Sequence, residues 1–270
     1  MAVDGRAGRE GEGRLRLATR RNVRRAVVGV VVIAVLVWSA LGCEVDLPML
    51  AHGIQTAAGF LRQSFPPDWH ELPTAIANLI VTVQMAFVAT VCAFVAALPV
   101  SFVAARTEAV PRPISVAVKQ CLNVMRAIPP IIYALLFVYM VGLGPFPGAL
   151  GIAVGSFVML AKLFAETLES VHPAPVEAVK AVGGNTAQVF AYGMLPQALP
   201  QFLSHTMYAW ELNISAATIM GVVGAGGIGQ QLMAEIHYYA WPQVSTYVLV
   251  LVLMVLLADA LSYQVRKRVT

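Results

Sequence analysis

Six stretches without Asp, Glu, Lys or Arg dominate this sequence and limit what it can fold into. They cover residues 26–43, 72–105, 127–161, 181–210, 212–234 and 236–258. About 20 apolar residues cross a hydrocarbon layer roughly 30 Å thick as a helix, because every backbone polar group is then bonded within the segment. Only 12% of the residues are charged, against about a quarter in ordinary soluble domains. The sequence therefore predicts an all-α, polytopic membrane protein.

Prolines, glycines and polar residues divide these stretches into six expected transmembrane helices. The run 127–161 is interrupted by Gly144–Gly148, which contains two prolines and predicts two spans joined by a tight turn. The run 181–210 carries several glycines, prolines and glutamines, and we interpret it as amphipathic and interfacial. The remaining spans are expected near 26–42, 76–103, 209–229 and 244–262.

Basic residues orient the six spans, because cytoplasmic loops retain Lys and Arg. Of the 18 basic residues, only Arg62 falls on the side expected to be extracytoplasmic. This segregation predicts cytoplasmic termini, with a basic tail at 1–25 and a short basic end at 263–270, and an extracytoplasmic loop at 43–75. The basic tail is expected to lie beside anionic lipid rather than on nucleic acid.

The cytoplasmic segment between the fourth and fifth spans, placed at 166–208, predicts a helix, a sharp turn and a second short helix. Pro173 begins the first helix, and Glu177 is expected in its first turn, at the positive end of the helix dipole. Gly183 supplies a left-handed stop. Asn185, followed three residues later by Gln188, has the spacing of a capping box. Such a pair is too polar for lipid and too apolar for water, so it is expected to bind a protein groove.

This segment resembles the cytoplasmic signature of the membrane subunits of binding-protein-dependent ABC importers. That signature reads E-A-A, three residues, G, nine residues, I, one residue, L-P. The matching residues are Glu177, Ala178, Gly183, Leu195 and Pro196, whereas Val179 and Gly193 depart from it. The resemblance implies a six-helix permease of the type I importer class, whose coupling helix docks into an ATP-hydrolysing subunit. It assigns Glu177 to anchoring the loop, Gly183 to the turn and Pro196 to ending the second helix.

Three further segments look most like the permeases of phosphonate and phosphate importers: Tyr192–Gln197, Trp210–Ile214 and Gly221–Gly229. Together the matches cover roughly residues 70–262, the expected transmembrane core. The resemblance implies that a phosphonate, phosphate or related oxyanion is delivered by an extracytoplasmic binding protein. Ser215 is neutral where those permeases often have a basic residue, so the choice of anion, or of a different small solute, stays open.

The chain has no phosphate-binding loop, so the sequence predicts a subunit that is not an enzyme and binds no cofactor of its own. ATP and Mg²⁺ are expected on two partner P-loop ATPase subunits. The other expected partners are a second permease copy, identical or related, and the lipid bilayer. A secondary transporter is the rival interpretation, but it would need inverted repeats and usually more spans.

Six residues near the fifth span are candidates for a translocation path or gate: Glu211, Asn213, Ser215, Gly224, Gly226 and Gly227. A carboxylate inside a membrane is costly, and for Glu211 we prefer a structural pairing, with Asn213 or His205, over substrate contact. The glycines match a dinucleotide fingerprint in letters only, since no strand precedes them. Close packing or a gate hinge is the favoured interpretation, and no catalytic or metal-ligating set is expected.

Overall fold

A computed structural model describes residues 25, 27–44, 47–106 and 110–269, and all regular structure within these ranges is helical. The chain divides into two compact units, residues 1–60 and 61–270. The first unit contains an apolar helix at Val27–Gly42 and most of α2 (Leu47–Ser64). Apart from Arg25, the expected basic tail lies outside the described residues. Large apolar side chains of the helix at 27–42 are exposed, as expected for a helix whose natural surroundings are lipid.

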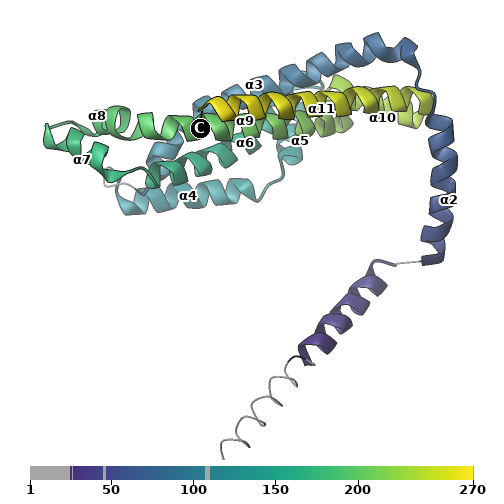
Figure 1. The fold of residues 1–270 in the computed structure, drawn as a ribbon, viewed down its shortest axis with the longest axis horizontal. Coiled ribbons are helices and arrows are strands. Elements are labelled where there is room, and N and C mark those ends of the chain that lie inside the picture. Colours follow the sequence, from purple (N-terminus) through teal and green to yellow (C-terminus); the bar gives the residue numbers. More distant parts are fainter. Residues whose placement is uncertain (1–24, 26, 45–46, 107–109, 270) are drawn as a thin grey trace, which may run out of the picture. The chain divides into compact units, whose positions relative to one another are not determined.

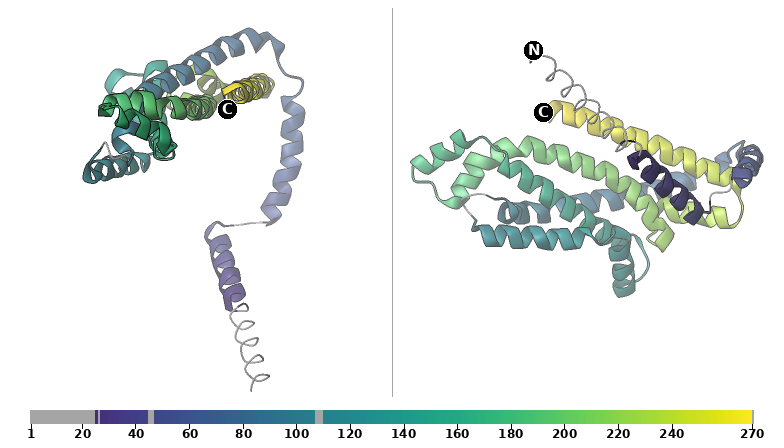
Figure 2. Two further views of the ribbon diagram at one scale, coloured as in Figure 1. Left: turned by 60° about the vertical axis from the view of Figure 1, so that its left-hand side comes forward. Right: turned by 90° about the horizontal axis from the view of Figure 1, so that it is seen from below.

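The second unit is built around four long helices. They are α3 (Leu72–Ala104), α6 (Pro145–Glu169), α9 (Leu195–Met220) and α11 (Trp241–Val269). Figures 1 and 2 show these helices running side by side along the length of this unit. The short helix η1 (Trp69–Glu71) precedes α3 and is capped by Asp68, whose carboxylate accepts the His70 N–H.

Alanines form the face of α3 that packs on its neighbours, among which α6 makes the most extensive contact. Ala86, Ala89, Ala93 and Ala97 are at most 1% exposed. Their spacing of three or four residues places them on one side of a helix. Membrane helices gain contact energy mainly by such close approach of small residues, because lipid is as apolar as any side chain.

The helices α4 (Arg112–Arg126) and α5 (Pro130–Val141) meet at a bend of 80°. The bend falls at Pro129–Pro130, because proline lacks an N–H and disfavours a helical conformation in the residue before it. α5 packs against α6 at two glycines: a Cβ atom on Gly151 would lie 2.6 Å from Ala134, and one on Gly155 would lie 2.7 Å from Pro130. The expected span that begins at residue 127 is therefore a 12-residue helix joined to α4.

Two further expectations about helix ends are wrong. The turn in the run 127–161 was expected at Gly144–Gly148, but the chain turns at 142–144. The helix α6 then begins at Pro145 with both prolines in its first turn, where a missing N–H costs little. The fifth span was expected at 209–229, after an interfacial segment. In the structure α9 already begins at Leu195 and ends at Met220, and α10 (Gly227–His237) follows at an angle of 47°.

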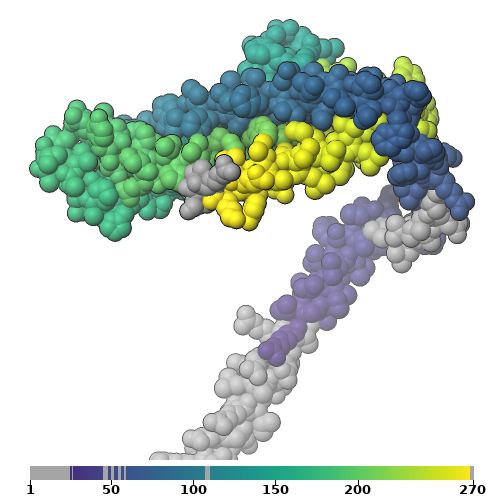
Figure 3. Space-filling model, turned by 45° about the horizontal axis from the view of Figure 1, so that its top comes forward, coloured from purple at the N-terminus to yellow at the C-terminus, as the bar shows by residue number. Residues whose placement is uncertain are grey.

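Three helices of the described residues are long and apolar enough to cross a membrane, and each of the two bent pairs would add one more. The apolar helix at Val27–Gly42 is shorter, so the count of six remains a prediction. The three helices differ in how much of their apolar 18-residue segment is buried within the structure: 56% in α6, 33% in α3 and 22% in α11. α6 is thus the central helix, and α11 presents most of its apolar surface outward, beside α3 (Figure 3).

Candidate functional site

The segment between α6 and α9 forms a helical hairpin, residues 172–194, at one end of the second unit (Figure 1). Its first helix, α7 (Pro173–Ala181), begins after His172, whose Nδ1 accepts a hydrogen bond from the Ala174 N–H at 3.3 Å. The helix stops before Gly183, which has a φ of +83°. This left-handed conformation favours glycine, so the predicted turn is confirmed.

The expected position of Glu177 at the start of α7 is wrong. Glu177 is the fifth residue of the helix, and no acidic residue lies in its first turn. The helix begins at Pro173 as predicted, because the ring of proline suits the first helical position, and this start leaves Glu177 beyond the first turn. The carboxylate therefore gains little from the helix dipole, which acts within the first turn. It is an exposed group on the hairpin surface.

The second half of the hairpin begins with the predicted capping box. Asn185 Oδ1 accepts the Gln188 N–H at 2.9 Å, and Gln188 Oε1 accepts the Asn185 N–H at 2.8 Å, around α8 (Thr186–Gln188). The chain continues through η2 (Val189–Met194), a π-helix, directly into α9. The prediction that Pro196 ends a helix is wrong, because Pro196 lies in the first turn of α9, where proline is tolerated.

The two halves of the hairpin are held together by contacts that the sequence did not predict. The side chain of Gln197 forms two hydrogen bonds with the backbone of His172: its Oε1 accepts the His172 N–H at 3.1 Å, and its Nε2 donates to the His172 carbonyl at 3.3 Å. Nε2 also donates to the Gly193 carbonyl at 2.6 Å. A Cβ atom on Gly193 would lie 3.1 Å from the Val176 Cα. Pairings across 25 residues leave no local pattern from which they could be predicted.

The hairpin presents apolar side chains to its surroundings. Val182 and Tyr192 are 85% and 72% exposed, and Ala178 is exposed as well. Large exposed apolar groups beside polar ones mark a surface that binds another protein or lipid. A cleft of about 290 Å³ lies between the hairpin and the ends of α3 and α6, and charged residues that include Glu177 and Lys180 line it.

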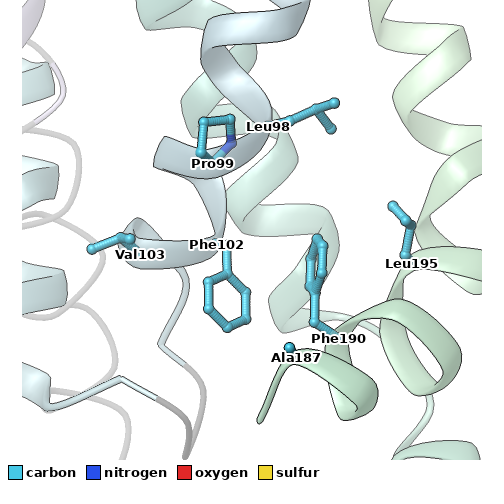
Figure 4. Close-up of a pocket in the computed structure, with 7 residues that line it drawn as sticks. All are labelled: Leu98, Pro99, Phe102, Val103, Ala187, Phe190 and Leu195. Atoms are coloured by element: carbon cyan, nitrogen blue, oxygen red, sulfur yellow. The ribbon is translucent and has the colours of Figure 1, made fainter.

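Leu195 belongs to the base of the hairpin rather than to this exposed surface. It lines an apolar pocket of about 510 Å³ with Leu98, Pro99, Phe102 and Val103 of α3 and Ala187 and Phe190 of the hairpin. Figure 4 shows Phe102 and Phe190 facing one another across this pocket. Their ring centroids are 4.8 Å apart in an edge-to-face arrangement, which is a favourable geometry. The hairpin is thus seated on the end of α3 by apolar contacts.

Asn213 lies in a closed hydrogen-bond network and does not face an open path. Its Oδ1 accepts the Ser156 hydroxyl of α6 at 2.6 Å, and its Nδ2 donates to Thr90 Oγ1 of α3 at 2.8 Å. All three residues are at most 6% exposed. Ser215, two residues further on, is exposed. Of these two candidates for the translocation path, Asn213 is therefore buried between helices, whereas Ser215 lies on the surface of α9.

Glu211 is half-buried and pairs with Arg266 of α11, with 3.8 Å between Oε2 and Nη2. The sequence predicted a structural pairing with Asn213 or His205, and the pairing is instead with Arg266. This arginine lies on a separate helix, 55 positions along the chain, and nothing in the residues around Glu211 indicates it. The pair places opposite charges together at the interface of α9 and α11.

The glycine segment breaks the fifth span. Gly224, Gly226 and Gly227 have φ angles of +83°, +80° and +71°, and side chains other than glycine rarely adopt these values. The break is fixed to α3, because the Ile228 N–H donates to Thr82 Oγ1 at 2.9 Å. A Cβ atom on Gly227 would collide with the same oxygen. Close packing therefore explains Gly227, and the helical surroundings offer no dinucleotide site.

An apolar helical core with an exposed, internally braced hairpin at one end defines a polytopic membrane subunit of a transport system. Residues 97–270 match the family described as binding-protein-dependent transport system inner membrane component. The chain belongs to this family, and it is the permease of a binding-protein-dependent ABC importer. It is a multi-pass membrane protein and the non-enzymatic component of its system, as the sequence predicted.

Three relatives are similar over most of this chain. The phosphite transport system permease PtxC of Stutzerimonas stutzeri is 40% identical over 223 residues, covering 82% of this chain and 81% of its own length. The phosphite permease HtxC, described as putative, from the same organism is 32% identical, covering 91% and 87%. The phosphate-import permease PhnE of Mycolicibacterium smegmatis is 32% identical, covering 78% of this chain and 40% of its own.

Among solved structures, the inward-facing methionine ABC transporter MetNI is similar with a TM-score of 0.68. The match covers 75% of this chain and 99% of the other, at 23% identity. At this identity the likeness concerns the fold. It agrees with the predicted type I importer fold.

Proposed function

We propose that this chain is the membrane permease of an ATP-driven importer for a phosphorus oxyanion such as phosphite, phosphate or a phosphonate. Two relatives that match over most of their own length are both described as phosphite permeases, and a third is a phosphate-import permease. An extracytoplasmic binding protein would deliver the anion. A permease for a different small solute is the alternative, and the transport assay below decides between them.

The main support for ATP-driven transport is the exposed hairpin. Val182 and Tyr192 protrude from this hairpin, whose backbone is fixed by the hydrogen bonds of Gln197 and by the capping box. A rigid element with exposed aromatic and aliphatic groups suits docking into a groove of a partner. We assign that partner to a P-loop ATPase subunit, which would hold ATP and Mg²⁺. Two ATPase copies would serve this chain and a second permease copy.

Transport would follow from the geometry of the docked hairpin. ATP binding would draw the two ATPase subunits together and carry the hairpins with them. The bases of the hairpins rest on α3 through the apolar pocket and continue into α9, so their displacement would tilt these helices between inward-open and outward-open states. In this arrangement the permease itself binds no nucleotide.

The assignment is tested by substituting the hairpin within the complete importer in proteoliposomes. Glu177→Gln combined with Gly183→Val is expected to abolish ATP-dependent uptake, because the β-branched residue opposes the left-handed turn at a cost of roughly 1–2 kcal/mol and a docking charge is removed. Glu166→Gln, an exposed carboxylate on α6, serves as the matched control. Normal uptake by the double variant would remove the coupling assignment.

The cargo is tested separately with the unchanged importer and its binding protein. Labelled phosphite, phosphate, methylphosphonate and methionine are offered in turn at equal concentration. Uptake of one of the three phosphorus anions, with methionine rejected, is the expected result. Uptake of methionine alone would assign the permease to a different solute while leaving the ATP-driven mechanism intact.

A further inference from the structure

A line of polar side chains joins α4 to the rest of the fold. Ser115, Lys119 and Asn123 are spaced by four residues and so lie on one face of the helix. The Ser115 hydroxyl donates to the Ala104 carbonyl at the end of α3 at 2.6 Å. Lys119 Nζ donates to Glu169 at 2.6 Å, and Asn123 Oδ1 accepts from Lys162 Nζ at 2.7 Å. We call these three bonds the α4 seam.

Among the residues that form the α4 seam, Glu169 lies beside the hairpin and lines the cleft at its base. The same carboxylate oxygen accepts Lys119 Nζ and, at 2.7 Å, the backbone N–H of Arg106 just beyond α3. Glu169 is the last residue of α6, and His172, which caps α7, follows three residues later. The side chains of Lys119 and Glu169 are only 23% and 28% exposed, so water screens this ion pair less than a surface pair. The ends of α3 and α6 and the middle of α4 thus meet at the base of the hairpin.

The other end of the bent pair lies at the glycine break. α4 continues across the 80° bend into α5, which packs into Gly151 and Gly155 of α6. Leu143 follows α5, and a Cβ atom on Gly224 would lie 2.5 Å from its Cδ2. Packed contacts therefore run from the hairpin base along α4 and α5 to the break between α9 and α10. Coupling between distant sites is carried by such contiguous packing and hydrogen bonds.

We propose that Lys119 and Glu169 are positioning residues that lock α4 to the base of the hairpin, so that α4 and α5 transmit hairpin movement to the glycine break. This inference rests on the proposed ATP-driven function. It assigns the bent pair a mechanical role and gives a reason why the polar face of α4 is bonded to the ends of α3 and α6. Charge-assisted bonds suit this role because they fix direction as well as distance.

The proposal is tested with Lys119→Met and Glu169→Gln, singly and together, in the complete importer. The measurement is the amount of anion imported per ATP hydrolysed. Lys119→Met is expected to lower this ratio roughly fivefold, within the range that single residues in coupled networks contribute, while ATP hydrolysis continues. The double variant should lose no more than the single ones, because the bond is removed only once. Lys119→Arg should retain the ratio, and Arg112→Met, an exposed position on α4, should leave it unchanged.

A second measurement separates this inference from the proposed function. With the native cysteines replaced by serine, single cysteines are introduced at Ala174, an exposed residue in the first turn of α7, and at Tyr139 on α5, which is 89% exposed. In the otherwise unchanged importer, ATP should alter the maleimide labelling rate at both sites. In Lys119→Met the change should persist at 174 and disappear at 139. An equal change at 139 in that variant would overturn the inference, whereas no change at 174 in the unchanged importer would overturn the proposed function.

Discussion

Single polar residues in the core of this permease act as interhelical joints. Asn213 contacts Ser156 on α6 and Thr90 on α3 within one closed network. The Thr90 hydroxyl in turn donates to the Ala86 carbonyl of its own helix at 2.7 Å. In a membrane interior no water can replace such bonds, so Asn213 aligns three helices that would otherwise be held by non-directional contacts.

Asn213→Leu is expected to lower the stability of the assembled importer in detergent by about 0.6–2 kcal/mol, the range measured for hydrogen bonds between membrane helices. The substitution leaves the Ser156 hydroxyl without its acceptor. The measurement is the thermal unfolding midpoint. Ser215→Ala on the exposed side of the same helix is the control and should leave the midpoint unchanged. A stable Asn213→Leu variant with reduced uptake would instead place Asn213 in the path.

Among the helices, α10 depends on a residue of another helix for its start. Its first turn contains no side-chain cap of its own, and the Ile228 N–H is bonded by Thr82 of α3. Thr82→Val keeps the shape of the side chain but leaves this buried N–H unpaired, so we expect a loss of roughly 1–3 kcal/mol in unfolding free energy. Thr218→Val is the comparison, because the Thr218 hydroxyl bonds only the Ile214 carbonyl of its own helix. Equal losses in both variants would show that the cap contributes nothing.

Local chemistry decided which features of the helices could be predicted. The left-handed Gly183, the capping box at Asn185 and the break in the run 127–161 each follow from residues within a few positions of one another. The contacts of Gln197, Glu211 and Lys119 join residues 25 to 55 positions apart, and only the fold brings these together. Helix ends at prolines were misjudged for a related reason. Proline stops a helix from continuing but is also well suited to its first turn, and the sequence does not say which role applies.

At the scale of the whole molecule, the second unit has two unlike ends. The hairpin lies at one end, and the connection from α10 to α11 lies at the other (Figure 1). Tyr238 and Tyr239 are exposed there, as expected for aromatic residues near a membrane surface. The positive-inside pattern then predicts that the hairpin end is cytoplasmic.

This orientation is tested by cysteine labelling in intact cells, after Cys43, Cys92 and Cys121 have been replaced by serine. A cysteine at Tyr238 should react with a membrane-impermeant maleimide added outside. A cysteine at Ala174 should react only after the cells are permeabilised. Both positions are exposed, and Ala174 is not part of the proposed docking surface, so a difference reports sidedness rather than burial. Reaction of Ala174→Cys in intact cells would invert the predicted topology.

The alanine face of α3 has a consequence for how an importer of this kind can change shape. Where helices approach through methyl groups, as at the alanines of α3, few side chains have rotamers that could adjust to a new separation. Parting α3 from α6 would forfeit the whole contact at once, so we expect this pair to tilt together as one rigid body. The changes in relative position that alternate access are then left to the elements that meet this pair through bends, glycines and charged contacts.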